Sequence, residues 1–398
     1  MGNIKGRLDP EASVLAIGGS VALTAGATGL ILNPEGLYQN GFLGLMTFLF
    51  GISTIALGKS PIGEAGGWRL KLVGGTILAL IGMTTAFLPD SPERYTRWIL
   101  FMCLCPGGLA QLMEMLLSNR KLPTWKAQGG PLKTLAITCI GVYCASVLLG
   151  AAVLLPQKPL TPLGKAQWAL ASAYGIGLLV LSLLIARVRE IYPKPEEELR
   201  LPIMRMERSM MFVTGIFMTA LGITLIPVSL GILKFSGDAQ LGLLLIIMSI
   251  QIMATGNTPL GMMAPPQIGM PLGVFGSVLG TLSSLIPGAL TVPLTITVAV
   301  FNLAGGALGL KGLGLSRSKT MEALIKMGRE KPPSPLIGLW QVQTAMNCIS
   351  ILFGISMLVR HLIPGWIVGM ILTMNGLMLM VMMRLLDEIQ RLSSPPNA

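Results

Sequence analysis

The sequence predicts an all-α polytopic membrane protein with about twelve transmembrane helices, arranged as six glycine-striped helical hairpins. Hydrophobic residues make up 52% of the 398 residues, only 12% are charged, and the mean hydropathy is +0.72. An ordinary soluble domain carries roughly 25% charged residues. Runs of about 20 apolar residues, the length that crosses a bilayer, recur along the whole chain. These observations exclude a soluble globular enzyme.

Each apolar run predicts one membrane span. The ninth and tenth spans are the least clearly separated, because the apolar region 256–290 is interrupted by several prolines, and eleven spans or a re-entrant segment are alternatives there. The predicted spans are 12–32, 40–58, 69–88, 98–117, 133–155, 166–186, 209–233, 239–256, 270–286, 288–310, 336–359 and 363–385.

The distribution of basic residues predicts the topology. Most of the 29 Lys and Arg residues fall in segments on one side of the membrane if the N-terminus is cytoplasmic and the loops alternate. Both termini are therefore expected in the cytoplasm, with the protein in a bacterial inner (plasma) membrane. The net charge of +12 then reflects contact with membrane lipids that are anionic on the cytoplasmic side, and nucleic acid is not an expected partner.

The chain is predicted to consist of two three-hairpin membrane halves, 1–186 and 209–398, joined by a charged cytoplasmic linker at 187–208. Small residues recur at intervals of seven, almost two helical turns, and so form a stripe on one helix face where backbones can approach closely. The expected helix-packing residues are Gly19, Gly26, Gly44, Gly51, Gly75, Gly82, Gly215, Gly222, Gly273 and Gly280, together with the four-residue pair Gly305 and Gly309.

A glycine-striped hairpin that ends in a proline turn resembles the HdeD acid-resistance membrane protein family. Two motifs carry the resemblance, Gly75–Gly82–Pro89 and Gly273–Gly280–Pro287. That family resembles one half of this chain, which would then hold two tandem copies. The resemblance implies a bacterial inner-membrane protein linked to stress tolerance, and it brings no catalytic residues with it.

Residues that usually carry chemistry are scarce. The single histidine, His361, excludes a haem held by two histidines and a His-based zinc site. No phosphate-binding loop, nucleophile elbow or Cys-x-x-Cys pair occurs. The many methionines, including Met370, Met374 and Met378 on one helix face, raise copper transport as an alternative, but thioethers also pack adaptably in apolar cores. We therefore expect no enzymatic activity, cofactor or metal site.

Three polar residues within or near the spans are candidates for a polar site, namely Glu114, Gln251 and Asn302. Ionisable residues inside a membrane often mark an ion pathway, and Glu114 is the one that qualifies. It also lies close to basic residues at the end of its span, where a structural role would suffice. Interhelical hydrogen bonding is the alternative for Gln251 and Asn302.

The uncharged segment 256–271 is the most unusual stretch of the chain. It is interpreted as a surface that docks another membrane subunit, as a re-entrant loop, or as a hydrophobic connector. The residues that define it are Pro259, Met262, Met263, Pro265, Pro266 and Pro271. The basic segment 311–335 is expected to be either an interfacial helix on anionic lipid or a solvated loop.

Two functions follow from these patterns. The first is a non-catalytic integral membrane protein, a scaffold or accessory subunit of a membrane assembly or an envelope-stress protein. The second is a secondary transporter of an uncharged or lipid-like small molecule, with a midplane cavity near Asn302 and residues 256–271. An enzyme that modifies a quinone or lipid is a third, weaker alternative.

Overall fold

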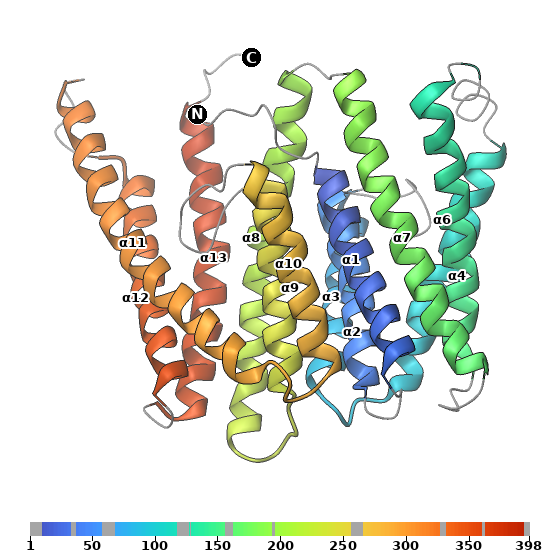
Figure 1. Cartoon of the computed structure of the whole chain (residues 1–398). Coiled ribbons are helices and arrows are strands. Elements are labelled where there is room, and N and C mark those ends of the chain that lie inside the picture. The colour runs from blue at the N-terminus through green and yellow to red at the C-terminus, as the bar shows by residue number, and fades with distance from the viewer. Residues whose placement is uncertain are drawn as a thin grey trace. The chain divides into compact units, whose positions relative to one another are not determined.

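The protein is an all-α polytopic membrane protein (Figure 1). The computed structural model describes residues 10–32, 37–57, 68–117, 127, 129–155, 162–192, 196–255, 266–326, 332–359 and 363–393. Twelve helices and no strands occur within these ranges, and eight of the helices are long and apolar enough to cross a membrane. The predicted spans agree with the helices to within a few residues, apart from extensions of α7, α8, α11 and α13.

The chain forms two compact units. Unit 1 comprises Met1–Ser209, Lys234–Gly256 and Ala264–Thr291. Its helices are α1 (Pro10–Ile31), α2 (Gln39–Leu57), α3 (Trp68–Phe87), α4 (Glu93–Leu117), α6 (Gly130–Leu154), α7 (Pro162–Ile191), α9 (Gly237–Thr255) and α10 (Pro266–Leu285). Unit 2 comprises Met210–Leu233, Asn257–Met263 and Val292–Ala398. It is built from most of α8 (Glu196–Ser229) and α11 (Thr291–Lys326), with α12 (Ser334–Leu358) and α13 (Gly365–Ser393).

These units differ from the two halves expected from the sequence. Helices α9 and α10 belong by sequence to the second half, yet they pack within unit 1 against α1, α2 and α3. The charged segment 187–208 is mostly helical, because α7 continues to Ile191 and α8 begins at Glu196. Helix α11 likewise continues to Lys326, so residues 311–326 of the segment that was expected to be an interfacial helix or a solvated loop extend the tenth span as one continuous helix.

Glycines form the closest helix contacts of unit 1. A methyl group on Gly175 of α7 would lie 2.7 Å from the carbonyl oxygen of Gly19 on α1. The same holds between α2 and α3, where a Cβ on Gly82 would lie 2.6 Å from the carbonyl oxygen of Gly44. Such close backbone approach is the usual way in which helices associate in lipid, where the hydrophobic effect gives no drive. Gly51 and Gly75 repeat this contact in α2 and α3, Gly26 approaches α7, and Gly242, Gly273 and Gly280 do so between α9 and α10.

Unit 2 uses the same kind of contact. A Cβ on Gly376 of α13 would lie 2.5 Å from the carbonyl oxygen of Gly215 on α8, and Gly222 and Gly369 approach one another along the same two helices. Between α11 and α12, Gly306 and Gly309 both lie against Asn347. Each of these contacts joins helices from different predicted hairpins, so the glycine stripes pack across the hairpins.

The pattern of helix pairing is the same in the first six helices and the last six. The first helix of each set packs on the sixth (α1 on α7, α8 on α13), the second on the third (α2 on α3, α9 on α10), and the fourth on the fifth (α4 on α6, α11 on α12). Equivalent residues make equivalent contacts. A Cβ on Gly150 of α6 would lie 2.6 Å from the Cys105 nitrogen, and one on Gly354 of α12 would lie 3.1 Å from the Leu303 nitrogen. We therefore treat α1–α7 and α8–α13 as two repeats.

Candidate functional site: a cavity in the first repeat

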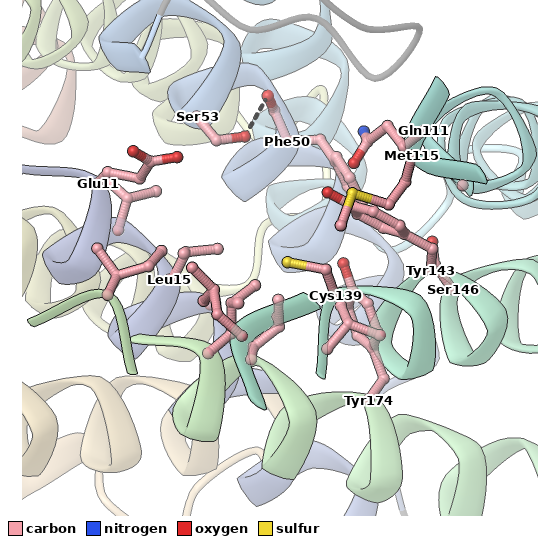
Figure 2. A pocket seen from close by; sticks show the side chains of 18 of the residues that line it. Glu11, Leu15, Phe50, Ser53, Gln111, Met115, Cys139, Tyr143, Ser146 and Tyr174 are labelled. Carbon is pink, nitrogen blue, oxygen red and sulfur yellow. Dashed lines mark hydrogen bonds between the residues drawn. The ribbon is translucent and has the colours of Figure 1, made fainter. Parts of the chain in front are cut away.

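Unit 1 holds a cavity of about 560 Å³ between α1, α2, α4, α6 and α7. Its wall is mainly apolar, with leucines such as Leu15, Leu135 and Leu178 facing the space. Figure 2 shows Glu11, Gln111 and Cys139, from three different helices, directed toward this space. Five helices of the first repeat therefore line one mostly apolar space with a few convergent polar groups, as is typical of ligand sites.

Charged groups gather at one end of the cavity. Glu11 lies in the first turn of α1, Glu114 in the last turn of α4 and Arg189 in the last turn of α7, and all three line the cavity. Ser53 and Thr54, near the end of α2, add hydroxyl groups. We call this the Glu11 end. Two of its three charged groups are carboxylates.

The cavity continues from the Glu11 end to the middle of the helices. Along α6 its lining runs from Leu132 to Ser146, which corresponds to about 21 Å at 1.5 Å per residue. At its deep end the Ser146 hydroxyl donates a hydrogen bond of 2.9 Å to the carbonyl oxygen of Leu104 on α4. Pro106, which has no N–H group, interrupts the hydrogen bonds of α4 near this point. One backbone hydrogen bond of the otherwise continuous helix α4 is therefore absent beside the deep end of the cavity.

Two cysteines and a tyrosine line the deeper part of the cavity. Cys103 of α4 and Cys139 of α6 are both 8% exposed, and Tyr143 lies one turn after Cys139. The wall between α4 and α6 therefore carries two thiols and one phenol at this depth.

The opposite end of unit 1 is tied together by polar contacts around Arg97 of α4. The Arg97 guanidinium donates hydrogen bonds to Glu93 Oε2 (2.9 Å), to Gln39 Oε1 on α2 (3.1 Å) and to the carbonyl oxygen of Val153 on α6 (3.3 Å). Its side chain is 17% exposed. We call this the Arg97 end. Three of the five helices that form the cavity are held by one guanidinium at the end opposite the Glu11 end.

Tyr38 closes the same end from the segment before α2. Its hydroxyl donates a hydrogen bond of 3.0 Å to the carbonyl oxygen of Ala86 at the end of α3, and its own N–H donates one of 2.9 Å to the carbonyl oxygen of Leu285 at the end of α10. Burial raises the pKa of Tyr38 to about 12, and the nearby carboxylates of Glu93 and Asp90 act in the same direction.

This pKa predicts a loss of stability at alkaline pH. The unfolded chain ionises Tyr38 near pH 10, before the folded chain does. The stability that this group contributes is therefore complete below about pH 10 and is lost as the pH rises through about 12. We expect the melting temperature of the wild type to fall more steeply over this window than that of Tyr38→Phe. Tyr95→Phe, which changes a tyrosine that is 70% exposed, should behave as the wild type, and an equal slope in all three proteins would refute the assignment.

The structure places the sequence-predicted polar residues in different parts of the chain. Glu114 lines the cavity, whereas Gln251 on α9 is not among its lining residues. Asn302 lies in unit 2, where its Nδ2 donates to the Val298 carbonyl oxygen and its Oδ1 accepts a hydrogen bond of 3.0 Å from Ser350 on α12. It therefore joins α11 to α12. Asn302 does not line the cavity of unit 1, and residues 256–265 lie outside the described part of the chain, so the expected midplane cavity near Asn302 and residues 256–271 stays a prediction.

Other predicted residues are only partly described. Pro266 is the first residue of α10, and Pro271 lies inside that helix. Pro259, Met262, Met263, Pro265 and His361 lie outside the described residues. Glu11 was not predicted as a site residue, because it precedes the predicted first span and acidic residues are common in the first turn of any helix.

Unit 2 contains a second hollow, an open groove of about 680 Å³ between α11, α12 and α13. Its lining includes Lys311 and Ser316 of α11, Gln343 and Asn347 of α12, and Met382 of α13. No group of three or more His, Cys, Asp and Glu residues that could hold a metal ion occurs among the side chains that the structure describes in either unit.

The fold and its cavity define a multi-pass helical membrane protein. One partial similarity to a curated protein was found, to the "Putative manganese efflux pump MntP" of Methanosphaera stadtmanae, which is 38% identical over 73 residues. The matched segment covers 18% of this chain and 40% of that protein. No protein-family model and no solved structure matches the chain. The resemblance to the HdeD family stays a prediction.

Proposed function

We propose that the chain is a secondary transporter and that the cavity of the first repeat is its solute pathway. The observation that carries this proposal is a cavity that begins among charged groups at the Glu11 end, reaches half the helix length, and is closed by the Arg97 contacts at the other end. A carrier that is open to one side of the membrane would contain such a cavity, which supports the proposal. By the distribution of basic residues, the Glu11 end faces the cytoplasm of a bacterial inner membrane, where both termini also lie.

The solute is a small cation. Glu11 and Glu114 supply two carboxylates against the single guanidinium of Arg189, and Gln111, Ser53 and Thr54 add neutral oxygen atoms. Oxygen ligands suit hard cations such as Mn²⁺ and Mg²⁺. Because no denser set of metal ligands is present among the described residues, the cation would be held weakly enough to leave again, as transport requires. The uncharged or lipid-like solute named for the transporter in the sequence analysis stays the alternative solute.

The partial relative also supports a small cation as the solute. That relative is named as a putative manganese efflux pump, and it is roughly half as long as this chain. One repeat of this chain is therefore about as long as the whole relative. Mn²⁺ is accordingly the first cation to test.

Purified protein in lipid vesicles loaded with a Mn²⁺-sensitive dye provides the experiment. We expect wild-type vesicles to take up Mn²⁺ faster than empty ones, and Glu114→Gln to lower that rate about tenfold, since a contact to a charged group is worth roughly 1.5 to 3 kcal/mol. Glu190→Gln is the matched control, because Glu190 is an exposed carboxylate that does not line the cavity. Wild-type vesicles that take up neither Mn²⁺ nor Mg²⁺ faster than empty ones would refute the cation carrier.

A scaffold or accessory subunit is the alternative function. Exposed apolar side chains on unit 2, including Val292, Ile296 and Val300, could contact either lipid or other membrane subunits, so they are compatible with this alternative. Against it, the glycine stripes that could pack against partner spans are already occupied by the chain's own helices. Mass spectrometry after purification in mild detergent separates the two functions, since a stoichiometric set of membrane partners would support the scaffold.

A further inference from the structure

The groove in unit 2 occupies the place in the second repeat that the cavity occupies in the first. The two repeats can be aligned by their sequence motifs. Gly75, Gly82 and Pro89 of the first repeat precede Gly273, Gly280 and Pro287 of the second by the same number of residues. The same separation aligns α4 with α11. Gly107-Gly108 then correspond to Gly305-Gly306, and Leu117-Ser118 correspond to Leu315-Ser316. The cavity-lining residues Gln111, Glu114 and Met115 then correspond to Gly309, Gly312 and Leu313, which all line the groove.

The fifth and sixth helices of each repeat agree with this correspondence. The shared pattern Cys-x-Ser, at Cys144 and Ser146 of α6 and at Cys348 and Ser350 of α12, aligns the two helices. In this alignment, the cavity residues Cys139, Val142 and Tyr143 correspond to Gln343, Met346 and Asn347 of the groove. The contacts of Gly26 with Ser172 and of Gly222 with Thr373 align α7 with α13, and Leu181 of the cavity then corresponds to Met382 of the groove.

The chemistry of the two places has diverged. The first repeat has the carboxylate of Glu114 where the second has Gly312, and the second has Lys311 where the first has Met113. The groove therefore combines one ammonium group with the hydroxyl of Ser316 and the amides of Gln343 and Asn347. These are hydrogen-bond donors for an anion with several oxygen atoms.

The surroundings of the groove suit a lipid. Val292, Ile296, Val300 and Leu308 are all exposed and follow one another at one- or two-turn intervals along α11, so they form an apolar strip that leads to Lys311. Past the groove, the Arg317 guanidinium lies 5.3 Å from the ring centroid of Trp340. Tryptophan prefers the level of the lipid headgroups. The transition from apolar to basic residues along α11 thus falls at the groove.

We propose that this groove binds the phosphate of an anionic glycerophospholipid, with Lys311, Ser316 and the amides of α12 around the headgroup and the acyl chains along the strip on α11. Gly312 leaves room for the headgroup, because nothing lies within 4 Å of the position of a Cβ there. The repeat that carries the carboxylates serves the proposed solute, and the other repeat holds the membrane lipid. This proposal rests on the residues of the groove and would hold even if the chain transports no solute.

Native mass spectrometry of the full chain in detergent, titrated with phosphatidylglycerol or phosphatidylcholine, tests the proposal. We expect one tightly retained phosphatidylglycerol per chain and at least tenfold weaker retention of phosphatidylcholine. Gly312→Glu places a carboxylate in the groove at the position that corresponds to Glu114 of the first repeat. This variant should lower phosphatidylglycerol retention at least tenfold, and so should Lys311→Gln. Gly314→Glu is the matched control for the first variant, because it adds the same charge to the same helix at a position that also has no neighbour within 4 Å.

Each other outcome would overturn the proposal. If Gly314→Glu weakens retention as much as Gly312→Glu, the lipid responds to net charge and not to the groove. If Lys319→Gln, which removes a charge outside the groove lining, matches Lys311→Gln, the attraction is that of the whole basic helix. Competition by millimolar inorganic phosphate would assign the groove to a free anion instead. Equal retention of both lipids by the wild type would remove the charge selectivity on which the proposal depends.

Discussion

Replacement of Gly82 by leucine is expected to abolish the folded protein. A Cβ at this position would lie 2.6 Å from the carbonyl oxygen of Gly44 and 2.9 Å from the Cα of Phe48. Both are backbone atoms of α2, which cannot move aside as the end of a side chain can. Overpacking of a core usually costs about 1–3 kcal/mol, so we expect Gly82→Ala to lower stability by that amount and Gly82→Leu to yield little monodisperse protein.

The control for this prediction lies on the same helix. Gly74 of α3 has no atom within 4 Å of its Cβ position, so Gly74→Ala and Gly74→Leu should fold as well as the wild type. Gel filtration in detergent and thermal unfolding of the four variants provide the measurement. A Gly82→Leu protein that elutes and melts like Gly74→Leu would show that α2 and α3 do not pack as closely as the structure places them.

The helices could be predicted from the sequence, but their partners could not. A long apolar run has to cross the bilayer as a helix, because lipid offers no hydrogen bonds to the backbone, and so the spans follow from composition. A glycine stripe marks the face on which two backbones approach, but it says nothing about which other helix approaches it. Gly19 of α1 packs on α7, which is separated from α1 by most of the first repeat.

The candidate site was predictable to a similar degree. Glu114 stands out in the sequence because a carboxylate near the end of an apolar run is rare. Glu11 has no such signal, and it joins the site only because α1 packs on α7 and lies beside the cavity. The groove at Lys311 becomes recognisable only after the helix pairing shows which positions of the two repeats correspond.

Loss of the Arg97 side chain is expected to open the cavity to the side of the membrane that it now excludes. Arg97 ties α4 to α2 and α6 through two acceptors, Gln39 Oε1 and the Val153 carbonyl oxygen. A net contribution of roughly 1.5 to 3 kcal/mol per contact to a charged group would hold this end closed in nearly all molecules. Arg97→Ala should therefore raise the population that is open at the Arg97 end at least tenfold, since each 1.4 kcal/mol corresponds to that factor.

Cys103 reports this change, because it lines the cavity about two turns from Arg97. In a chain with the other four cysteines replaced by serine, a membrane-impermeant maleimide applied from the Arg97 side should label Cys103 slowly. Adding Arg97→Ala should accelerate labelling at least tenfold, whereas Arg94→Ala, which removes an exposed guanidinium one turn away, should not.

The side from which Cys103 is reached distinguishes a carrier from a channel or a collapsed protein. Reagent applied from the Glu11 side reaches Cys103 along the existing cavity in the wild type, so fast labelling is expected there before any substitution. If Arg97→Ala increases access from the Arg97 side while lowering it from the Glu11 side, the two ends are coupled as alternating access requires. If Cys103 of the Arg97→Ala protein is labelled rapidly from both sides at once, the Arg97 contacts close one end of the cavity but the two ends do not alternate, which contradicts a carrier. If Cys103 of the wild type is already labelled rapidly from the Arg97 side, the Arg97 contacts do not close this end.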